Sequence, residues 1–164
     1  METVLFASPQ EITISTIVGG NVDVDKYNMH ISDTQVFTIK PLLGSLLYDK
    51  IVADVVADTL TGLYLELVNN YVKPITKYKS VSTFVALNSY SLNNSGLFKN
   101  TPKDVQVVSD RATENISDRY SSMAQMYVTN FYAWIALNKL EEYKEDQNGI
   151  KPVTININNG WRYS

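Results

Sequence analysis

Three acidic residues, Asp49, Asp54 and Asp58, recur at roughly helical spacing and form the first group of side chains that could do chemistry. Carboxylates on one helix face can share a divalent ion or act as an acid and base pair. A series of this kind is more often the solvated face of a helix. A metal-dependent enzyme built on these residues is therefore the least favoured hypothesis.

A second group alternates oxygen-bearing side chains in the segment Asn21-Val-Asp-Val-Asp25. Calcium loops alternate in this way, but they also need a central glycine and a distal glutamate, which are missing here at the required spacing. The acidic run from Glu141 to Asp146 has the composition of a solvated helix end. We expect neither segment to hold a metal ion.

The chain contains one histidine, His30, and no cysteine. This composition excludes disulfides, thiolate zinc sites and cysteine nucleophiles. A serine triad would need His30 beside a strained serine, and no Gly-x-Ser-x-Gly motif occurs. Neither a P-loop nor a Gly-x-Gly-x-x-Gly motif is present. We predict a protein that is not an enzyme and has no catalytic residues, metal or cofactor, and in which His30 is structural or on the surface.

Length and charge indicate one mildly acidic domain. The chain has 164 residues, with 14 Lys and Arg against 17 Asp and Glu, so no basic excess suggests nucleic-acid binding as its main role. The N-terminus lacks the pattern of a signal peptide, and the most apolar window, Met123–Leu137, is too short to span a bilayer. We expect a soluble protein with no membrane partner. The 11 tyrosines are typical of interfaces, where the ring of a tyrosine is buried and its hydroxyl stays in contact with water.

The dominant structural signal is a stretch between Pro102 and Gly149 without glycine or proline. Its apolar residues repeat every 3.6 positions on average, as in a straight α-helix. They are Val105, Val108, Ala112, Ile116, Tyr120, Met123, Tyr127, Phe131 and Trp134. A helix over about 103–141 would be roughly 55–60 Å long, in a domain only about 40 Å across. We expect it either to break or to be covered from outside, which indicates a subunit of an assembly.

The two halves of that helix differ in character. The first half is polar on one side, whereas the second half, from Met123, is apolar almost all round. A helix that is apolar on every side is surrounded by partners. We therefore expect the second half to lie at the centre of the bundle.

Shorter helices are expected before it. Ser8-Pro9-Gln10-Glu11 predicts a capping box. Ser32, with Gln35 three residues later and an Ile31–Val36 staple, predicts a second start, in a helix that ends at Gly44 and is kinked or restarted at Pro41. Three more helices are predicted. The first is capped by Ser45 and ends near 60–62, the second covers Leu63–Val72, and the third covers Ile75–Leu87 after a kink or restart at Pro74. A small hairpin is predicted around 94–96.

The end of the chain has strand periodicity instead, since Val153, Ile155 and Ile157 alternate with polar residues, and Trp161 and Tyr163 follow. Such a segment needs a partner strand or groove, and a flexible tail is the alternative. The sequence thus predicts an all-α helical bundle with one long C-terminal helix over residues 1–149, and an extended, β-like C-terminal arm over residues 150–164.

Most of the chain also resembles a known family. Asn21-Val-Asp-Val-Asp25, then Ile31 and the run Ile39-Lys-Pro-Leu-Leu-Gly-Ser-Leu-Leu-Tyr48, are similar to the opening of tailed-phage head–tail connector proteins. Thr61-Gly-Leu-Tyr64, Leu67–Pro74 and the Asn93–Leu97 loop before a long final helix continue the likeness over roughly residues 5–140. The versions that it resembles most are the ring or head-completion proteins of phages of Bacteroidetes hosts, including the crAss-like group.

The resemblance implies an all-helical structural protein made in the host cytoplasm and located at the head–tail junction of the virion. Copies would form a dodecameric homo-oligomeric ring under the portal protein, the next connector or tail protein would dock below, and DNA would pass through the lumen without sequence-specific binding. The alternative is a helical protein-binding or adaptor module of a non-viral assembly.

Two surfaces are candidates for these contacts. Mixed charge on the first half of the long helix suits a polar interface that fixes register between subunits, at Asp110, Arg111, Glu114, Asp118 and Arg119. The arm is the candidate for attachment to the portal or to a neighbour by strand addition, through Val153, Ile155, Ile157, Trp161 and Tyr163.

Overall fold

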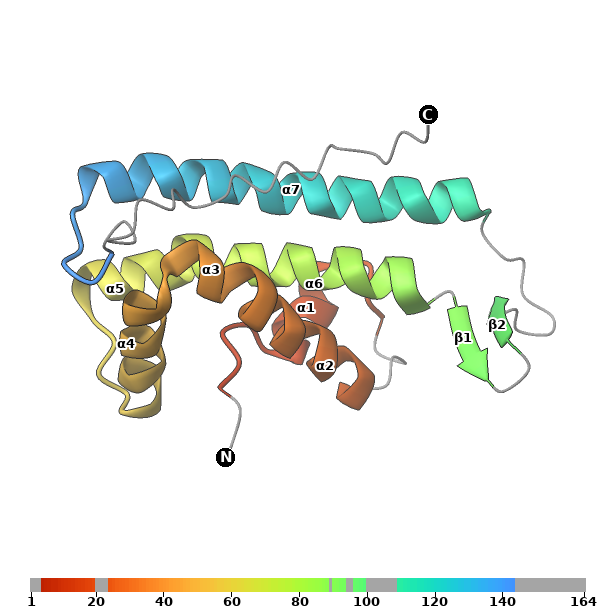
Figure 1. Cartoon of the computed structure of the whole chain (residues 1–164), viewed down its shortest axis with the longest axis horizontal. Coiled ribbons are helices and arrows are strands. Elements are labelled where there is room, and N and C mark those ends of the chain that lie inside the picture. Colours follow the sequence, from red (N-terminus) through yellow and green to blue (C-terminus); the bar gives the residue numbers. More distant parts are fainter. Residues whose placement is uncertain (1–3, 20–23, 89, 94–95, 100–108, 144–164) are drawn as a thin grey trace.

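The computed structural model describes residues 4–19, 24–88, 90–93, 96–99 and 109–143, and this part of the chain is all-α, with five continuous helices (Figure 1). Two of them contain π-helical turns, labelled η. The elements are α1 (Pro9–Ser15), α2 (Val24–Thr34), η1 (Gln35–Ile39), α3 (Lys40–Leu43), α4 (Ser45–Val56), α5 (Gly62–Leu67), η2 (Val68–Val72), α6 (Lys73–Asn88) and α7 (Asp110–Leu137). A two-stranded antiparallel hairpin, β1 (Tyr90–Asn93) and β2 (Gly96–Lys99), follows α6.

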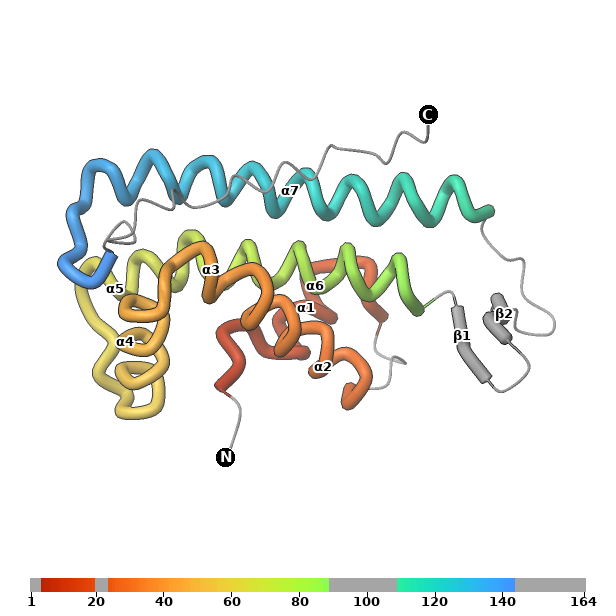
Figure 2. The backbone as a smooth tube through the Cα atoms, in the orientation of Figure 1, coloured from red at the N-terminus to blue at the C-terminus, as the bar shows by residue number. Residues whose placement is uncertain are grey.

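Helix α6 occupies the middle of the fold. Together with α5 and η2 it forms one continuous helix, Gly62–Asn88, which we call the central rod. Helix α6 packs against α7 on one side and α2 on the other, and the tube in Figure 2 shows α7 running alongside the whole α5–η2–α6 rod. The expectation that the second half of α7 lies at the centre of the bundle is wrong, because only one face of α7 is buried. Within the described ranges, no helix is both apolar enough and long enough to cross a membrane.

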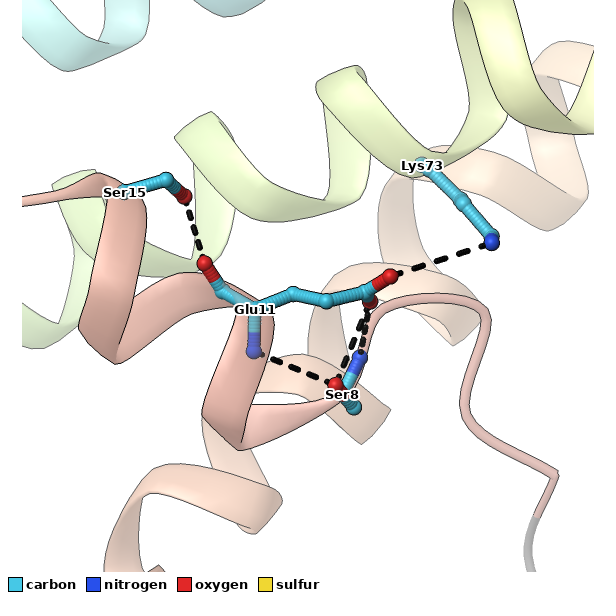
Figure 3. A network of polar contacts seen from close by, with 4 residues as sticks. All are labelled: Ser8, Glu11, Ser15 and Lys73. Atoms are coloured by element: carbon cyan, nitrogen blue, oxygen red, sulfur yellow. Dashed lines mark hydrogen bonds and ion pairs between the residues drawn. The ribbon is translucent and has the colours of Figure 1, made fainter.

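The predicted capping box of α1 is confirmed (Figure 3). The backbone N–H of Ser8 donates to Glu11 Oε2 at 2.9 Å, and the Glu11 N–H donates to Ser8 Oγ at 3.2 Å. Lys73 of α6 lies 3.9 Å from the other carboxylate oxygen of Glu11. This network satisfies two N-terminal donors of a seven-residue helix that could not stand alone, and it orients α1 towards the central rod.

The predicted helix start at Ser32 is wrong. Helix α2 begins at Val24 and continues past Ser32 without a break. Gln35 is buried and accepts from the Phe6 N–H at 2.8 Å while donating to the Val4 carbonyl at 2.8 Å. Val36 is half exposed, so it makes no staple with Ile31. Gln35 therefore holds the N-terminal segment against the first rod, formed by α2, η1 and α3, instead of capping a helix.

Pro41 and Pro74 each follow a π-helical turn within a continuous helix. The N–H of Lys40 donates to the carbonyl of Gln35, five residues back, and the N–H of Lys73 donates to that of Val68 in the same way. A proline has no N–H and crowds the carbonyl four residues before it, and a wider turn relieves that clash. Neither proline ends its helix, so the restart that the sequence leaves open at each position does not occur.

Helix α4 starts differently from expectation. Gly44, with φ +75°, is its N-cap, and Ser45 is its first residue with no side-chain cap. The positive φ ends α3 at Gly44 as predicted and turns the chain sharply. Helix α4 then ends at Val56, earlier than the predicted 60–62, and Asp58 follows with φ +54°.

The long helix is shorter than predicted at both ends. Ser109 is its N-cap and accepts from the Ala112 N–H at 3.3 Å, while Asn138 is its C-cap. Its 28 residues span about 42 Å, and the neighbouring rod from Gly62 to Asn88 is nearly as long. The expected mismatch of about 55–60 Å against 40 Å is therefore wrong, because one face of α7 is covered by a rod of matching length. Val105 and Val108, the first residues of the predicted stripe, lie outside the described residues.

The core forms two clusters along the central rod. One joins α3, α4, α5, η2 and α7 around Phe131, Leu67 and Ile51, which are fully buried. The other joins α1, α2 and α6 around Ile12, Ile31 and Val81. The two clusters fix opposite ends of the rod, so the surfaces on either side of it are held on a firm support.

Candidate functional site

The five charged residues predicted as a subunit interface are all exposed on α7. They lie on its first half, and the opposite side of this half packs on α6. We call this surface the charged face of α7, and it consists of Asp110, Arg111, Glu114, Asp118 and Arg119. The structure brings these side chains together on one helix.

Hydrogen bonds hold the first half of α7 in place. Ser117 Oγ donates to the Ser82 carbonyl at 3.0 Å, which ties α7 to α6. The Tyr120 hydroxyl accepts from the Ile17 N–H at 3.0 Å, which ties α7 to the segment after α1. Because both anchors lie on the inner side, the charged face is presented on a fixed helix instead of a loop.

Aromatic rings line one edge of the contact between α7 and the central rod. Tyr78 stacks on Tyr127 with ring centroids 5.7 Å apart, and the ring centroid of Tyr120 lies 6.2 Å from that of Tyr78. Tyr71 lies 5.5 Å from Trp134. Aromatic pairs at these separations add to the burial energy by about 0.5–1.5 kcal/mol each. The tyrosines at this edge therefore work within the subunit, between its two longest helices.

A shallow, open groove of about 500 Å³ continues from this edge, between η2 and the second half of α7. We call it the neutral groove, because no charged side chain is among the described residues that line it. Its lining residues are Asn70, Tyr71, Tyr127, Asn130, Ala133, Trp134 and Leu137. Leu137 is 83% exposed, so an apolar surface at the end of α7 is open to a partner.

The chain beyond α7 is fastened at the same end of the molecule. The Tyr64 hydroxyl donates to Glu142 Oε2 at 2.6 Å, and this bond raises the pKa of Tyr64 to about 12 because it stabilises the protonated phenol. Lys50 lies over the Tyr64 ring at 4.6 Å and pairs with Asp54 at 3.0 Å. Tyr143 packs edge-on against Phe131. These contacts fix the point where the chain leaves the described fold.

A second apolar surface lies on the outer side of the first rod. Met29, Val36 and Phe37 are at least half exposed there, and Phe37 is 71% exposed. Val36 and Phe37 belong to the π-helical turn η1, and π-helical turns recur at functional sites. Since α6 separates the first rod from α7, the molecule presents two unlike surfaces.

The residues considered for catalysis are not gathered into a site. Asp54 pairs with Lys50, and Asp58 lies beyond the end of α4. His30 is buried edge-on against Phe84 at 5.5 Å, and burial lowers the pKa of its imidazole. Across the ranges that the structure describes, no three His, Cys, Asp or Glu residues are placed to hold a metal ion.

Two sequence predictions fall outside the described residues. The first is most of the Asn21–Asp25 segment, of which Val24 and Asp25 start α2. The second is the whole arm with its predicted contact residues Val153, Ile155, Ile157, Trp161 and Tyr163.

Sequence reasoning misses the neutral groove. Its signal is the seven-residue spacing shared by Tyr71 and Tyr78 on one helix and by Tyr120, Tyr127 and Trp134 on another. Two helices whose aromatic residues share the same spacing can pack along a common edge. Their pairing is a long-range contact, however, and the periodicity within each helix does not reveal it. The exposed amides of Asn70 and Asn130 follow only once that pairing is known.

Comparison with known proteins finds a family whose model matches this chain. The model of a family of unknown function, DUF6712, matches residues 39–153, which is more than half of the chain and includes α4 to α7. No curated protein and no solved structure matches the sequence.

Proposed function

We propose that this chain, which belongs to the family of unknown function DUF6712, is a structural virion protein that forms a ring between the portal and the tail of a bacteriophage. The ring provides a passage for DNA and a docking surface for tail components. The protein acts by binding copies of itself and its neighbours, without catalysis and without a cofactor.

One observation carries the proposal: a rigid α7 whose outer side is left uncovered by the described part of its own chain. This side offers mixed charge on its first half and the neutral groove on its second half. Mixed charge fixes register and orientation between subunits at little cost in solubility. The uncovered side of α7 thus supports association along the length of the helix.

The second apolar surface supports a ring over a two-fold dimer. A closed ring uses heterologous contacts, in which one face of a subunit meets a different face of the next. Phe37 and the charged face of α7 belong to opposite sides of α6, so the molecule has two unlike faces. The net charge of −3 suits a lumen along which DNA slides instead of binding tightly.

The proposal is tested by mixing the purified chain with a portal protein from the genome that encodes this chain and imaging the mixture by electron microscopy. Rings of this chain on the portal axis support the function. Binding to a different protein without ring formation would favour the adaptor of a non-viral assembly, and a chain that stays monomeric beside assembled portal would contradict the ring.

A further inference from the structure

The neutral groove selects its occupant by chemistry. Tyr127, Ala133 and Leu137 provide apolar contact surface, while Asn70 and Asn130 are exposed at its border. Each amide side chain can donate and accept hydrogen bonds, as the backbone of an extended peptide does. With no charge in the lining, a charged occupant would lose hydration without compensation. The groove therefore fits an uncharged, extended, partly apolar peptide.

One segment of this chain has those properties. Residues 144–164 follow the last described residue, and within them the stretch from Pro152 to Trp161 contains no charged side chain. Apolar residues alternate there with Thr154, Asn156 and Asn158. In an extended peptide, such an alternation places the apolar side chains on one side and the polar side chains on the other.

We propose that the neutral groove is the receptor for Val153–Trp161 of a neighbouring copy of this chain. This inference rests on the proposed function, because it supplies one of the heterologous contacts that a ring requires. Val153, Ile155 and Ile157 cover the aromatic side of the groove, and the peptide backbone bonds to Asn70 and Asn130. Each subunit gives its arm to one neighbour and receives an arm from the other.

The exit of the chain favours a neighbour over the same copy. Glu142 is bonded to Tyr64 of α5, and Tyr143 packs on Phe131, a fully buried residue on the inner side of α7. The groove instead includes the exposed residues Asn130 and Leu137 on the outer flank. The chain thus leaves from the side of α7 that faces its own core. Residues 144–152 can span up to about 30 Å when extended, which allows the arm to extend away from its own subunit.

Disulfide trapping tests the proposal cleanly, because the full-length chain has no cysteine. A Leu137→Cys copy and a size-tagged Ile155→Cys copy are mixed at millimolar concentration and oxidised. Val153→Cys and Ile157→Cys are tested in place of Ile155→Cys to sample the register. Leu137 is exposed, so its replacement does not disturb folding. The control is Leu87→Cys, at a residue that is also exposed but lies at the far end of α6.

The expected result is a disulfide-linked dimer of one tagged and one untagged copy, about tenfold more abundant with the Leu137→Cys copy than with the Leu87→Cys control, because docking raises the local concentration. Equal yields at both positions would overturn the proposal. A fast, concentration-independent disulfide within one chain of the Leu137→Cys, Ile155→Cys double variant would also overturn it. Ring formation on the portal is scored separately, so a ring without this cross-link refutes the groove while leaving the proposed function standing.

Discussion

The indole N–H of Trp134 on α7 donates to Glu66 Oε1 on α5 at 2.8 Å. Trp134 is buried, and it is the residue at which the aromatic contacts of α7 meet the neutral groove. One hydrogen bond therefore connects the end of the long helix, the central rod and the candidate docking surface.

Glu66→Ala removes the acceptor of this N–H, and we expect it to lower the free energy of unfolding by about 1–2 kcal/mol. Glu66→Gln keeps an acceptor oxygen and should cost less. Urea unfolding followed by tryptophan fluorescence measures both. Equal losses for the two variants would show that charge, and not the hydrogen bond, holds this contact.

The buried amide of Gln35 gives a larger expected effect. Gln35→Leu leaves the Phe6 N–H and the Val4 carbonyl without their partner, and we expect a loss of about 2–4 kcal/mol from these two groups. The matched control is Gln125→Leu, at an exposed position on α7, which should change stability by less than about 0.5 kcal/mol. Similar unfolding midpoints for both variants would contradict the role of Gln35.

The capping box should make α1 sensitive to pH. The hydrogen bond from the Ser8 backbone lowers the pKa of Glu11, and Lys73 lowers it further. Because the folded state favours the carboxylate, the stabilisation is present above the ordinary glutamate pKa and is lost as pH falls through the lower, folded pKa. Glu11 is largely exposed, so this amounts to a few tenths of a kcal/mol. The difference in unfolding free energy between the natural chain and Glu11→Gln should shrink as pH falls from about 6 to about 3, and a constant difference would contradict the assignment.

Two tyrosines should lose their phenol protons only at unusually high pH, for different reasons. Burial raises the pKa of Tyr27 to about 12, and the bond to Glu142 raises that of Tyr64 to about 12. We expect Glu142→Ala, which removes the acceptor and the charge together, to lower the pKa of Tyr64 towards its ordinary value of about 10 and to leave Tyr27 unchanged, as followed by NMR of ¹³C-labelled tyrosine rings. The raised folded pKa of Tyr64 means that the stabilisation is complete below about pH 10 and is lost as pH rises through about 12. A shift of both tyrosines would indicate a change of fold.

Local patterns in the sequence predict the elements of this fold well, and long-range contacts explain where they fail. The Ser8–Glu11 box lies within one turn, so its residues alone determine it. Ser32 and Gln35 repeat the same pattern, yet Gln35 bonds to Phe6 and Val4, which no local rule can indicate. The proline positions are visible in the sequence, which leaves open a kink or a restart at each, but it does not indicate the π-helical turn that lets each helix continue past its proline.

The candidate site shows the same division. A polar stripe on a helix avoids the core, so the sequence predicts that the charged residues of α7 are on the surface, and the structure places all five there. The prediction that the apolar second half is enclosed is wrong. The positions of apolar residues along a helix do not show whether another helix of the same chain covers each side of it. Met126 is 56% exposed and Leu137 is 83% exposed on that half.

The most direct test of the central claim reverses charge on the charged face and images the assembly. A Glu114→Lys, Asp118→Lys double variant and its matched control, Asp49→Lys with Asp58→Lys at exposed positions on α4 and in the turn after it, are each mixed with the portal protein and examined by electron microscopy. The account predicts rings on the portal for the natural chain and the control, and at least about tenfold fewer for the α7 variant, since like charges placed across an interface cost several kcal/mol. Rings of unchanged abundance with the α7 variant would contradict the claim that this face joins the subunits.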